Sequence, residues 1–264
     1  MKLLTINTHS LIEENYLQKL SEFINTVLIE KPDIIAMQEA NQSTGREAVL
    51  NPQRYIPCDN SAVIREDNHV YNAAQSLTDY FWTWLPVKNG YGKFDEGIAL
   101  MSRSPIIKTD VVTVSGICDY NNWKTRKLAG ICTEERPDEM FYSVHYGWWD
   151  DAQEPFEKQW NRTVSHMKKY GTVWLMGDFN NSSEVRNEGY DMIIKSGWHD
   201  SADEEYFTAH SGIDGWNSSA DNGMRIDFIF CNKPHNFLYS GPIFDGKNYS
   251  VISDHYGVIA KTAF

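Results

Sequence analysis

The first 40 residues carry two short apolar segments on either side of a segment with helical periodicity. Residues 2–8 and 33–39 are apolar runs that end in polar side chains, a pattern typical of buried strands. Between them, apolar residues recur at three- and four-residue spacing, at Leu17, Leu20, Ile24, Val27 and Leu28. This spacing predicts an amphipathic helix, which Pro32 ends. A strand, a helix and a second strand favour parallel pairing through a crossover connection, so the opening predicts an α/β fold.

The rest of the chain continues the alternation of strand-like and helical segments. We predict strands at residues 80–87, 97–102, 106–115, 128–132, 140–145, 172–177, 224–231 and 256–260, and helices at 153–170 and 183–196. Residues 43–75 are polar and without a clear period, and we interpret them as a long, substrate-facing excursion. Because we find no internal repeat and no linker, we expect one domain over residues 1–264, with sheets packed together and helices outside.

Charge and hydropathy argue against two classes of partner. With 24 basic and 36 acidic residues, the formal net charge is −12, and no basic cluster is longer than Lys168 and Lys169. A net negative field repels a polyanion, so we do not expect a nucleic-acid partner. No apolar segment approaches the roughly 20 residues that span a bilayer, so we expect no membrane partner.

The cysteines and the amino terminus bear on the compartment. The four cysteines are far apart in the sequence, and Cys132 and Cys231 lie in apolar runs, where a free cysteine behaves as a small hydrophobic residue. The amino terminus turns polar too early for the core of a signal peptide. We therefore expect a cytoplasmic location, while the sequence leaves the oligomeric state open.

Polar residues close several of the predicted strands. Asn7 and Glu39 end the two opening strands, and a parallel arrangement would bring them to one edge. A carboxylate beside an amide oxygen suits Mg²⁺, although a glutamate at a strand end is more often a surface or capping residue. Asp178 and Asn180 follow Gly177 after another apolar strand, where a simple turn is the alternative interpretation.

Two histidines and one aspartate form a further group. Asp227 lies in the middle of a predicted apolar strand, where a carboxylate is costly unless it is paired. His255 would satisfy it, and an aspartate that orients a histidine is a recurring catalytic arrangement. The alternative partners of Asp227 are backbone N–H groups. His145 ends another strand, a position at which a lone histidine is more often structural than catalytic.

Taken together, these motifs resemble those of the endonuclease/exonuclease/phosphatase superfamily. Seven occur in order along essentially the whole chain: Asn7, Gln38–Glu39, residues 97–105 (Gly-Ile-Ala-Leu-Met-Ser-Arg-Ser-Pro), His145, residues 177–180, residues 225–227 and residues 253–255. The resemblance implies a four-layer α/β/β/α sandwich of two packed mixed β-sheets with helices outside. It also implies hydrolysis of a phosphate ester that depends on Mg²⁺ or Mn²⁺.

The resemblance also implies a metal site. Glu39 would be the main ligand with Asn7 close by, and Asp254 would contribute to the metal side of the site. His9 departs from the pattern, because nuclease-type members often carry an acidic residue at this position. This departure puts a second metal position in doubt, although a histidine can still bind a metal or a phosphate.

The same resemblance assigns the hydrolytic roles. Asp178 would activate or orient the attacking water, and Asn180 would position the water and the phosphate. His145, and His255 oriented by Asp227, would donate hydrogen bonds to the phosphoryl oxygens. Metal and histidines together would stabilise charge in an in-line transition state.

For the substrate we favour a small phosphorylated metabolite such as a sugar phosphate. Residues 7–10, 119–126 and 144–150 resemble a bacterial branch of the superfamily that includes phosphatases of disaccharide phosphates such as maltose 6′-phosphate. Arg126 could grip a phosphate in a bidentate fork and Lys124 could act as a point charge, unless both are solvated surface charges. Tryptophans near strand ends or in loops could stack on a pyranose ring: Trp82, Trp84, Trp123, Trp148, Trp149 and Trp216. The alternative is that most of them fill the core.

Three other functions stay open. A nuclease needs a basic track for the nucleic-acid backbone, which the charge pattern does not provide. A sphingomyelinase or phosphoinositide phosphatase needs a membrane-facing helix or a polybasic patch, and neither is evident. An inactive binding module on the same scaffold has no support, because every proposed site position keeps a usable side chain.

Overall fold

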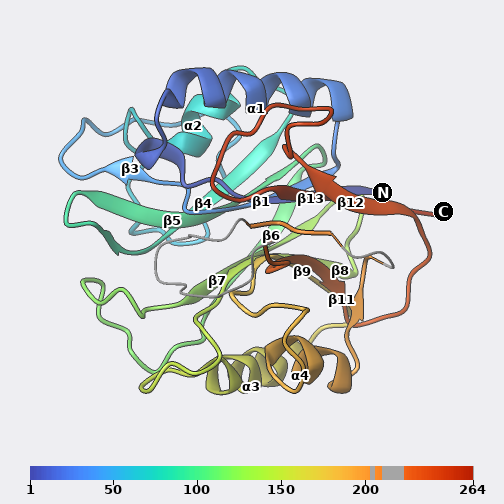
Figure 1. Cartoon of the computed structure of the whole chain (residues 1–264). Coiled ribbons are helices and arrows are strands. Elements are labelled where there is room, and N and C mark those ends of the chain that lie inside the picture. The colour runs from blue at the N-terminus through green and yellow to red at the C-terminus, as the bar shows by residue number, and fades with distance from the viewer. Residues whose placement is uncertain (203–205, 210–222, 264) are drawn as a thin grey trace.

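Two β-sheets pack face to face in the computed structural model, which describes residues 1–202, 206–209 and 223–263 (Figure 1). The first sheet comprises β1 (Lys2–Asn7), β2 (Ile34–Gln38), β3 (Gln42–Ser43), β4 (Phe81–Gly90), β5 (Phe94–Ser102), β12 (Phe237–Ile243) and β13 (Gly257–Thr262). The second comprises β6 (Ile106–Thr113), β7 (Lys127–Thr133), β8 (Glu139–His145), β9 (Thr172–Asp178), β10 (His199–Asp200) and β11 (Asp227–Cys231).

Helices cover the outer face of each sheet. The helices α1 (Tyr16–Glu30) and α2 (His69–Ala74) lie on the first sheet, and α3 (Phe156–Met167) and α4 (Gly189–Lys195) lie on the second (Figure 1). A short 3-10 helix, η1 (Ser10–Ile12), follows β1. The predicted four-layer α/β/β/α sandwich is therefore confirmed.

Strand direction explains why residues far apart in the sequence meet at one edge. The strand orders are β12-β13-β1-β2-β5-β3, with β4 paired to β5, and β10-β11-β9-β8-β7-β6. The pairs β1–β2 and β8–β9 are parallel, whereas the other strand pairs are antiparallel, so both sheets are mixed. Asn7 lies level with Gln38, and His145 lies level with Asp178. The carboxyl ends of each parallel pair therefore open at a common edge.

The apolar strands contribute side chains to two hydrophobic cores, one on each face of the sheet. Along β1, Leu3 packs between the sheets, whereas Leu4 packs under α1 and α2; in β2, Ala36 and Met37 divide in the same way. Alternate side chains of a strand point to opposite faces, so a strand buried on both faces has a continuous apolar sequence. A third core lies between the second sheet and α3, around Trp160.

The helix predictions need correction in their details. The buried side of α1 is formed by Leu20, Phe23, Thr26 and Val27, whereas Leu17 is 76% exposed and Leu28 is also exposed. The helix α3 begins at Phe156 rather than at residue 153, because the backbone N–H groups of Gln153 and Glu154 donate to Asp151 Oδ1 in a turn.

Two further boundaries differ from the prediction. The helix α4 begins at Gly189 rather than at residue 183, because Ser183 N donates to Arg225 O in a loop. The strand β11 begins at Asp227 rather than at residue 224, since Met224 pairs with Ala209 instead. Asp227 therefore starts its strand and does not lie in the middle of it. The strand β12 and the helix α2 were not predicted.

Residues 43–75 pack along β4. Trp82 N donates to Arg54 O, Ile56 N donates to Trp82 O, and the Tyr55 ring lies 4.7 Å from the Trp82 ring. This segment thus packs against β4 and includes the helix α2. Within the described residues, no helix is long and apolar enough to cross a membrane.

Candidate active site

A cavity of about 300 Å³ opens where the strand ends converge. Eight of the residues singled out from the sequence line it: Glu39, Trp123, Arg126, His145, Trp148, Asp178, Asn180 and His255. Asn7 lies directly behind this wall, where its Nδ2 donates to Glu39 Oε1 (3.0 Å) and to Asp178 Oδ2 (3.1 Å). The structure therefore brings the end of β2 next to the end of β9.

Asp178 is the centre of the hydrogen-bond network. Its Oδ1 accepts from Asn180 N (2.8 Å), and its Oδ2 lies 3.6 Å from His145 Nε2 and 3.8 Å from His255 Nε2. Burial raises the pKa of Asp178 to about 7, and the charge of Asp227 adds to this effect while that of His255 opposes it. A carboxylate with a pKa near neutrality is suited to accept a proton from water.

The two imidazoles differ in charge. His255 Nδ1 lies 2.9 Å from Asp227 Oδ2. Burial lowers the pKa of His255, but Asp227 and Asp178 outweigh burial and raise it well above 6.5. For His145, burial and the nearby Arg126 and Lys88 lower the pKa well below 6.5. One imidazole is thus cationic and the other neutral at pH 7, and both can donate a hydrogen bond.

Asp227 holds His255 rather than a set of backbone amides. Its carboxylate has one hydrogen-bond partner among the described residues, His255 Nδ1, and its Oδ1 is buried without any. The backbone N–H of Asp227 donates to Thr208 Oγ1. This pairing fixes the His255 tautomer with the proton on Nδ1 when the ring is neutral, and it directs Nε2 toward Asp178.

Gly177 places Asp178 at the end of β9. Its φ is +150°, and a Cβ at this position would lie 2.0 Å from Val144 O and 2.8 Å from Gln38 Nε2. Gly177→Ala is therefore expected to lower the free energy of unfolding by about 3 kcal/mol or more, since rigid neighbours cannot yield to an added methyl group. Chemical denaturation would measure this loss. Gly171→Ala is the control, because its Cβ would make only an ordinary contact; equal stability of both variants would contradict the assignment.

The residues around Glu39 fit a divalent metal ion. Glu39 has a left-handed backbone (φ +49°), and burial together with the Glu96 carboxylate raises its pKa. Among the described residues, the Glu39 carboxylate accepts a hydrogen bond only from the neutral Asn7 amide, and no lysine, arginine or histidine there forms an ion pair with it. Carboxylate oxygens near one another repel unless a cation lies between them, and hard oxygen ligands suit Mg²⁺ and Mn²⁺.

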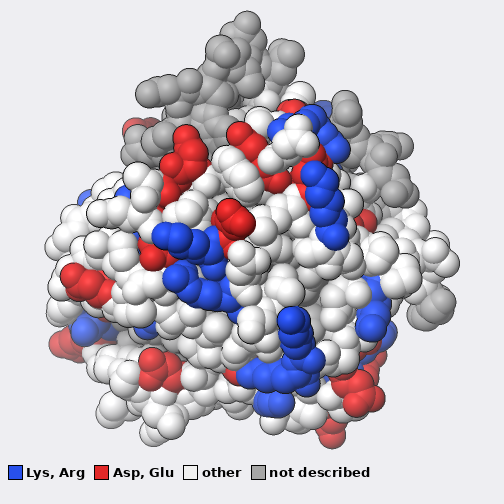
Figure 2. Space-filling model, turned by 90° about the horizontal axis from the view of Figure 1, so that it is seen from below, with Lys and Arg blue, Asp and Glu red and all other residues white. Residues whose placement is uncertain are grey.

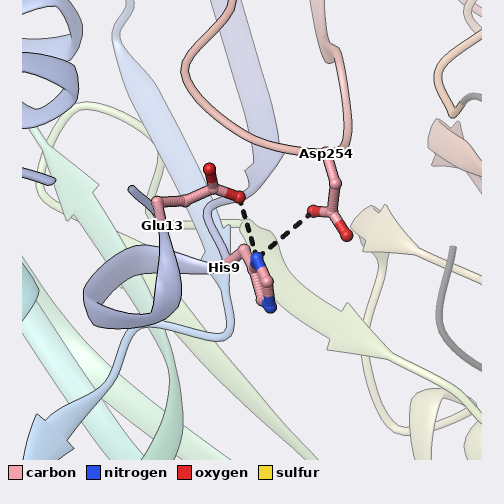
Figure 3. Close-up of side chains that lie close together, drawn as sticks. All are labelled: His9, Glu13 and Asp254. Atoms are coloured by element: carbon pink, nitrogen blue, oxygen red, sulfur yellow. Dashed lines mark hydrogen bonds and ion pairs between the residues drawn. The ribbon is translucent and has the colours of Figure 1, made fainter. Parts of the chain in front are cut away.

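His9 and Asp254 lie side by side but do not line the cavity. His9 and Glu13, on either side of η1, and Asp254, in the loop before β13, point their side chains toward one another (Figure 3). His9 Nδ1 lies 2.8 Å from Glu13 Oε1 and 3.8 Å from Asp254 Oδ1. Burial lowers the pKa of His9, but the charges of Asp254, Glu39 and Glu13 raise it overall. The Nδ1 of His9 thus faces two carboxylates and not the substrate cavity.

The remaining sequence candidates divide into three groups. Lys124 does not line the cavity, and its Nζ forms an ion pair with Asp151 Oδ2 (2.8 Å). Trp149 packs against the core under α3. Trp82 and Trp84 are fully buried in the core beneath α2, so their predicted role in stacking on a sugar ring is wrong. Trp216 lies outside the described residues. None of residues 43–75 lines the cavity, which corrects the prediction of a substrate-facing excursion.

Sequence reasoning missed most of the β4–β5 side of the cavity. Lys88, Asn89, Tyr91 and Glu96 line it there, next to Trp123. A usable signal was present, because a short hairpin joins two largely apolar strands and brings their polar ends, with Lys88 and Glu96, opposite each other.

Comparison with known proteins identifies the family. A model of the endonuclease/exonuclease/phosphatase family matches residues 4–255, whereas no curated protein sequence matches the chain. Among solved structures, a family protein from Leptotrichia buccalis is 28% identical with a TM-score of 0.87, and the match covers 100% of both chains. A mannosyl-6-phosphatase from Bacteroides thetaiotaomicron (16% identity, TM-score 0.68) also matches over 100% of both chains.

A 3′ phosphatase from Neisseria, bound to a product DNA hairpin, shares the fold as well. It is 18% identical with a TM-score of 0.66, and the match covers 100% of both chains. Members of the family hydrolyse phosphate esters and generally depend on a divalent metal ion. With a family model that matches almost the entire chain, this protein belongs to the endonuclease/exonuclease/phosphatase family.

Proposed function

We propose that this protein is a Mg²⁺- or Mn²⁺-dependent phosphomonoesterase that acts on a small phosphorylated metabolite, such as a sugar phosphate of the maltose 6′-phosphate type. The observation that carries the proposal is the state of Arg126. Its side chain is 95% buried on the cavity wall, its Nη1 donates to Trp123 O (3.1 Å), and its buried Nε has no hydrogen-bond partner among the described residues.

An unpaired buried guanidinium favours a dianionic ligand. Burying a charge costs several kcal/mol unless a partner of opposite charge offsets it, and Arg126 has no ion-pair partner in the described part of the chain. The other buried cation of the cavity, Lys88, is already paired with Glu96, which leaves Arg126 as the cation to be balanced. A terminal phosphate carries more negative charge than the phosphate of a diester, so Arg126 favours a monoester.

The proposed reaction uses the network around Asp178. Glu39, with Asn7 beside it, would hold a divalent metal ion, which would supply Lewis-acid stabilisation of charge on the phosphoryl group. Asp178 accepts one proton of a water whose oxygen attacks phosphorus, and the ester P–O bond breaks. The departing alkoxide takes a proton from solvent, so the products are the free alcohol and inorganic phosphate. Asn180, anchored through Nδ2 to Tyr146 O (2.8 Å), positions that water.

The two imidazoles and Arg126 stabilise the charge that develops on the phosphoryl group. His255, oriented by Asp227, donates through Nε2, and the neutral His145 donates its N–H. Such donors act in a buried site where their charge is little screened, which makes them effective in phosphoryl transfer. Asp254 and His9 lie farther from the cavity and would act through the metal side of the site.

The size of the cavity and the mixed charge of one outer face favour a small substrate over nucleic acid. A volume of about 300 Å³ lies in the range of small-molecule sites. On the face formed by α3 and α4, lysines and arginines lie among acidic side chains and form no uniform basic track (Figure 2).

The absence of disulfides among the four cysteines supports a reducing, cytoplasmic setting.

A substrate panel with Mg²⁺ or Mn²⁺ tests the proposal. It comprises hexose and disaccharide phosphates, nucleotides, supercoiled plasmid, sphingomyelin and phosphoinositides, with released phosphate as the main readout. Release of inorganic phosphate from a sugar phosphate supports the proposal. Nicking of the plasmid without phosphate release from any sugar phosphate would replace it with a nuclease.

Arg126→Met is expected to lower kcat/KM for phenyl phosphate by about 10- to 100-fold, the equivalent of a lost hydrogen bond to a charged group. Hydrolysis of bis(p-nitrophenyl) phosphate should fall much less, because a diester carries one charge fewer. Steady-state kinetics on both substrates measure the ratio. Arg103→Met is the control, since Arg103 is exposed and pairs with Asp33 on the surface. Equal losses on both substrates would contradict a role in monoester selection.

A further inference from the structure

The β4–β5 hairpin gives the cavity a group of polar side chains that the hydrolytic step does not use. Lys88 lies opposite Glu96 and Asn89 lies opposite Asp95 in the paired strands, and Lys88, Asn89 and Glu96 all line the cavity. Trp123 and Tyr91, both more than half exposed, line the same region. This part of the wall adjoins the site of hydrolysis, because Glu96 lines the same cavity as Glu39 and Asp178.

Lys88 and Glu96 form a buried ion pair. Their Nζ and Oε1 atoms are 3.0 Å apart, both side chains are 9% exposed, and Lys88 Nζ also donates to Trp123 O (3.2 Å). A buried ion pair is weak evidence for a stabilising role, because an apolar pair of similar volume often stabilises a fold equally well. The pair is better explained by its effect on the cavity wall, where it holds the Glu96 carboxylate in place.

Two acceptor atoms of this wall have no donor. Glu96 Oε2 accepts no hydrogen bond from any described residue, and Asn89 Oδ1 is buried without a partner although its Nδ2 donates to Asn121 Oδ1 (3.3 Å). Gly90 leaves Glu96 Oε2 uncovered, since a Cβ at residue 90 would lie 3.2 Å from that oxygen. Glu96 Oε2 is not fully buried, so a ligand in the cavity can donate a hydrogen bond to it. The Asn89 Oδ1 acceptor is buried without a donor, which costs free energy that a ligand hydroxyl group would offset.

We infer that Glu96 and Asn89 form a subsite for the hydroxyl groups of a sugar, next to the phosphate site; this inference rests on the proposed phosphomonoesterase function. Sugar hydroxyls donate to carboxylate and amide oxygens, and the C–H faces of the ring pack against aromatic side chains such as Trp123. Lys88 balances the charge of Glu96 through Oε1 and leaves Oε2 for the ligand. A lipid tail offers no donors to this wall.

The test compares a sugar phosphate with phenyl phosphate, which has a phosphate and no hydroxyl group. For the best sugar phosphate of a hexose and disaccharide panel, Glu96→Gln is expected to lower kcat/KM by about 10- to 100-fold, mainly through KM, as for a lost hydrogen bond to a charged group. Phenyl phosphate has no hydroxyl group for Glu96 to bind, so its hydrolysis by the Mg²⁺-loaded variant should fall much less. The ratio of kcat/KM for the sugar phosphate to kcat/KM for phenyl phosphate should therefore drop by about tenfold.

A second comparison separates a contact from an indirect effect. Deoxy analogues of the best sugar phosphate should include one that the wild-type enzyme hydrolyses more slowly and that Glu96→Gln hydrolyses no more slowly than the parent sugar phosphate. Asn89→Leu should show the same pattern with a different deoxy position. Glu66→Gln is the matched control, because Glu66 is exposed and pairs with Arg46 on the surface.

Three results would overturn the inference. An equal loss on sugar phosphate and phenyl phosphate would mean that Glu96 acts through Glu39 and the metal. Unchanged kinetics on both substrates in Glu96→Gln, or a wild-type enzyme that hydrolyses no sugar phosphate better than phenyl phosphate, would exclude a hydroxyl subsite. A wild-type enzyme that hydrolyses no monoester at all but nicks plasmid would instead refute the proposed function.

Discussion

Replacing Asp178 with asparagine is expected to lower kcat by about 10³- to 10⁴-fold while KM stays close to its original value. The amide has nearly the same shape as the carboxylate but cannot accept a proton from water. Asp178 Oδ2 lies within 4 Å of both imidazoles and of Asn7 Nδ2, so no other carboxylate can take over this position. Steady-state kinetics with Mg²⁺ measure the loss.

The same variant should be more stable than the wild-type protein at pH 8. The pKa of Asp178 is raised from 3.8 to about 7 in the folded protein, mainly by burial. Its contribution to stability is therefore fully present below pH 3.8 and is lost as the pH rises through 7. The Asp178→Asn variant lacks this dependence, so its advantage should appear at pH 8 and vanish near pH 4 when unfolding is measured in EDTA.

Activity and stability together make the assignment of Asp178 testable. A substitution that damages the fold would lower both activity and stability. Replacement of a catalytic base whose burial destabilises the fold lowers only the activity. Asp245→Asn serves as the control, because Asp245 lies in a loop and pairs with Lys247. Near-normal turnover of Asp178→Asn, or lower stability at both pH values, would contradict the assignment.

The sequence predicted the strand-end residues because strand register leaves them little freedom. Once β1 pairs with β2 and β8 with β9 in parallel, Asn7 and the residue before Glu39 lie level, as do His145 and Asp178. The packing of the two sheets against each other was predicted from the order of the family motifs. Local periodicity alone gives no information about which sheets pack together. Asp227 was predicted in the middle of its strand but is the first residue of β11. Its predicted pairing with His255 does not depend on this position, since it requires only that the two side chains lie within hydrogen-bond distance.

The β4–β5 side of the cavity could not be predicted from alternation. The register of this pair shifts between Pro86 and Lys88, and a β-bulge moves the following side chains to the other face. Lys88 thus reaches the cavity, whereas Trp82 and Trp84, earlier in the same strand, are buried in the core beneath α2. Likewise, nothing in the local sequence indicates that His9 directs Nδ1 to Glu13.

Glu39→Gln is expected to remove most of the metal-dependent activity. We expect kcat/KM to fall by about 10³-fold or more, because the loss of a charged ligand removes several kcal/mol of transition-state stabilisation. The affinity for Mn²⁺ should fall by at least about 100-fold, more than the effect of altering a residue that only supports a ligand. Isothermal titration calorimetry with Mn²⁺ measures this affinity without reference to turnover.

Thermal unfolding gives a further readout of the metal site. A metal ion that binds only the folded state raises the melting temperature, so Mg²⁺ or Mn²⁺ should stabilise the wild-type protein and EDTA should reverse the effect. Glu39→Gln should lose this shift, whereas Glu66→Gln should keep it. If Glu39→Gln retained both the shift and the Mn²⁺ affinity, the metal would have to lie elsewhere, and the cluster of His9, Glu13 and Asp254 would be the next position to test.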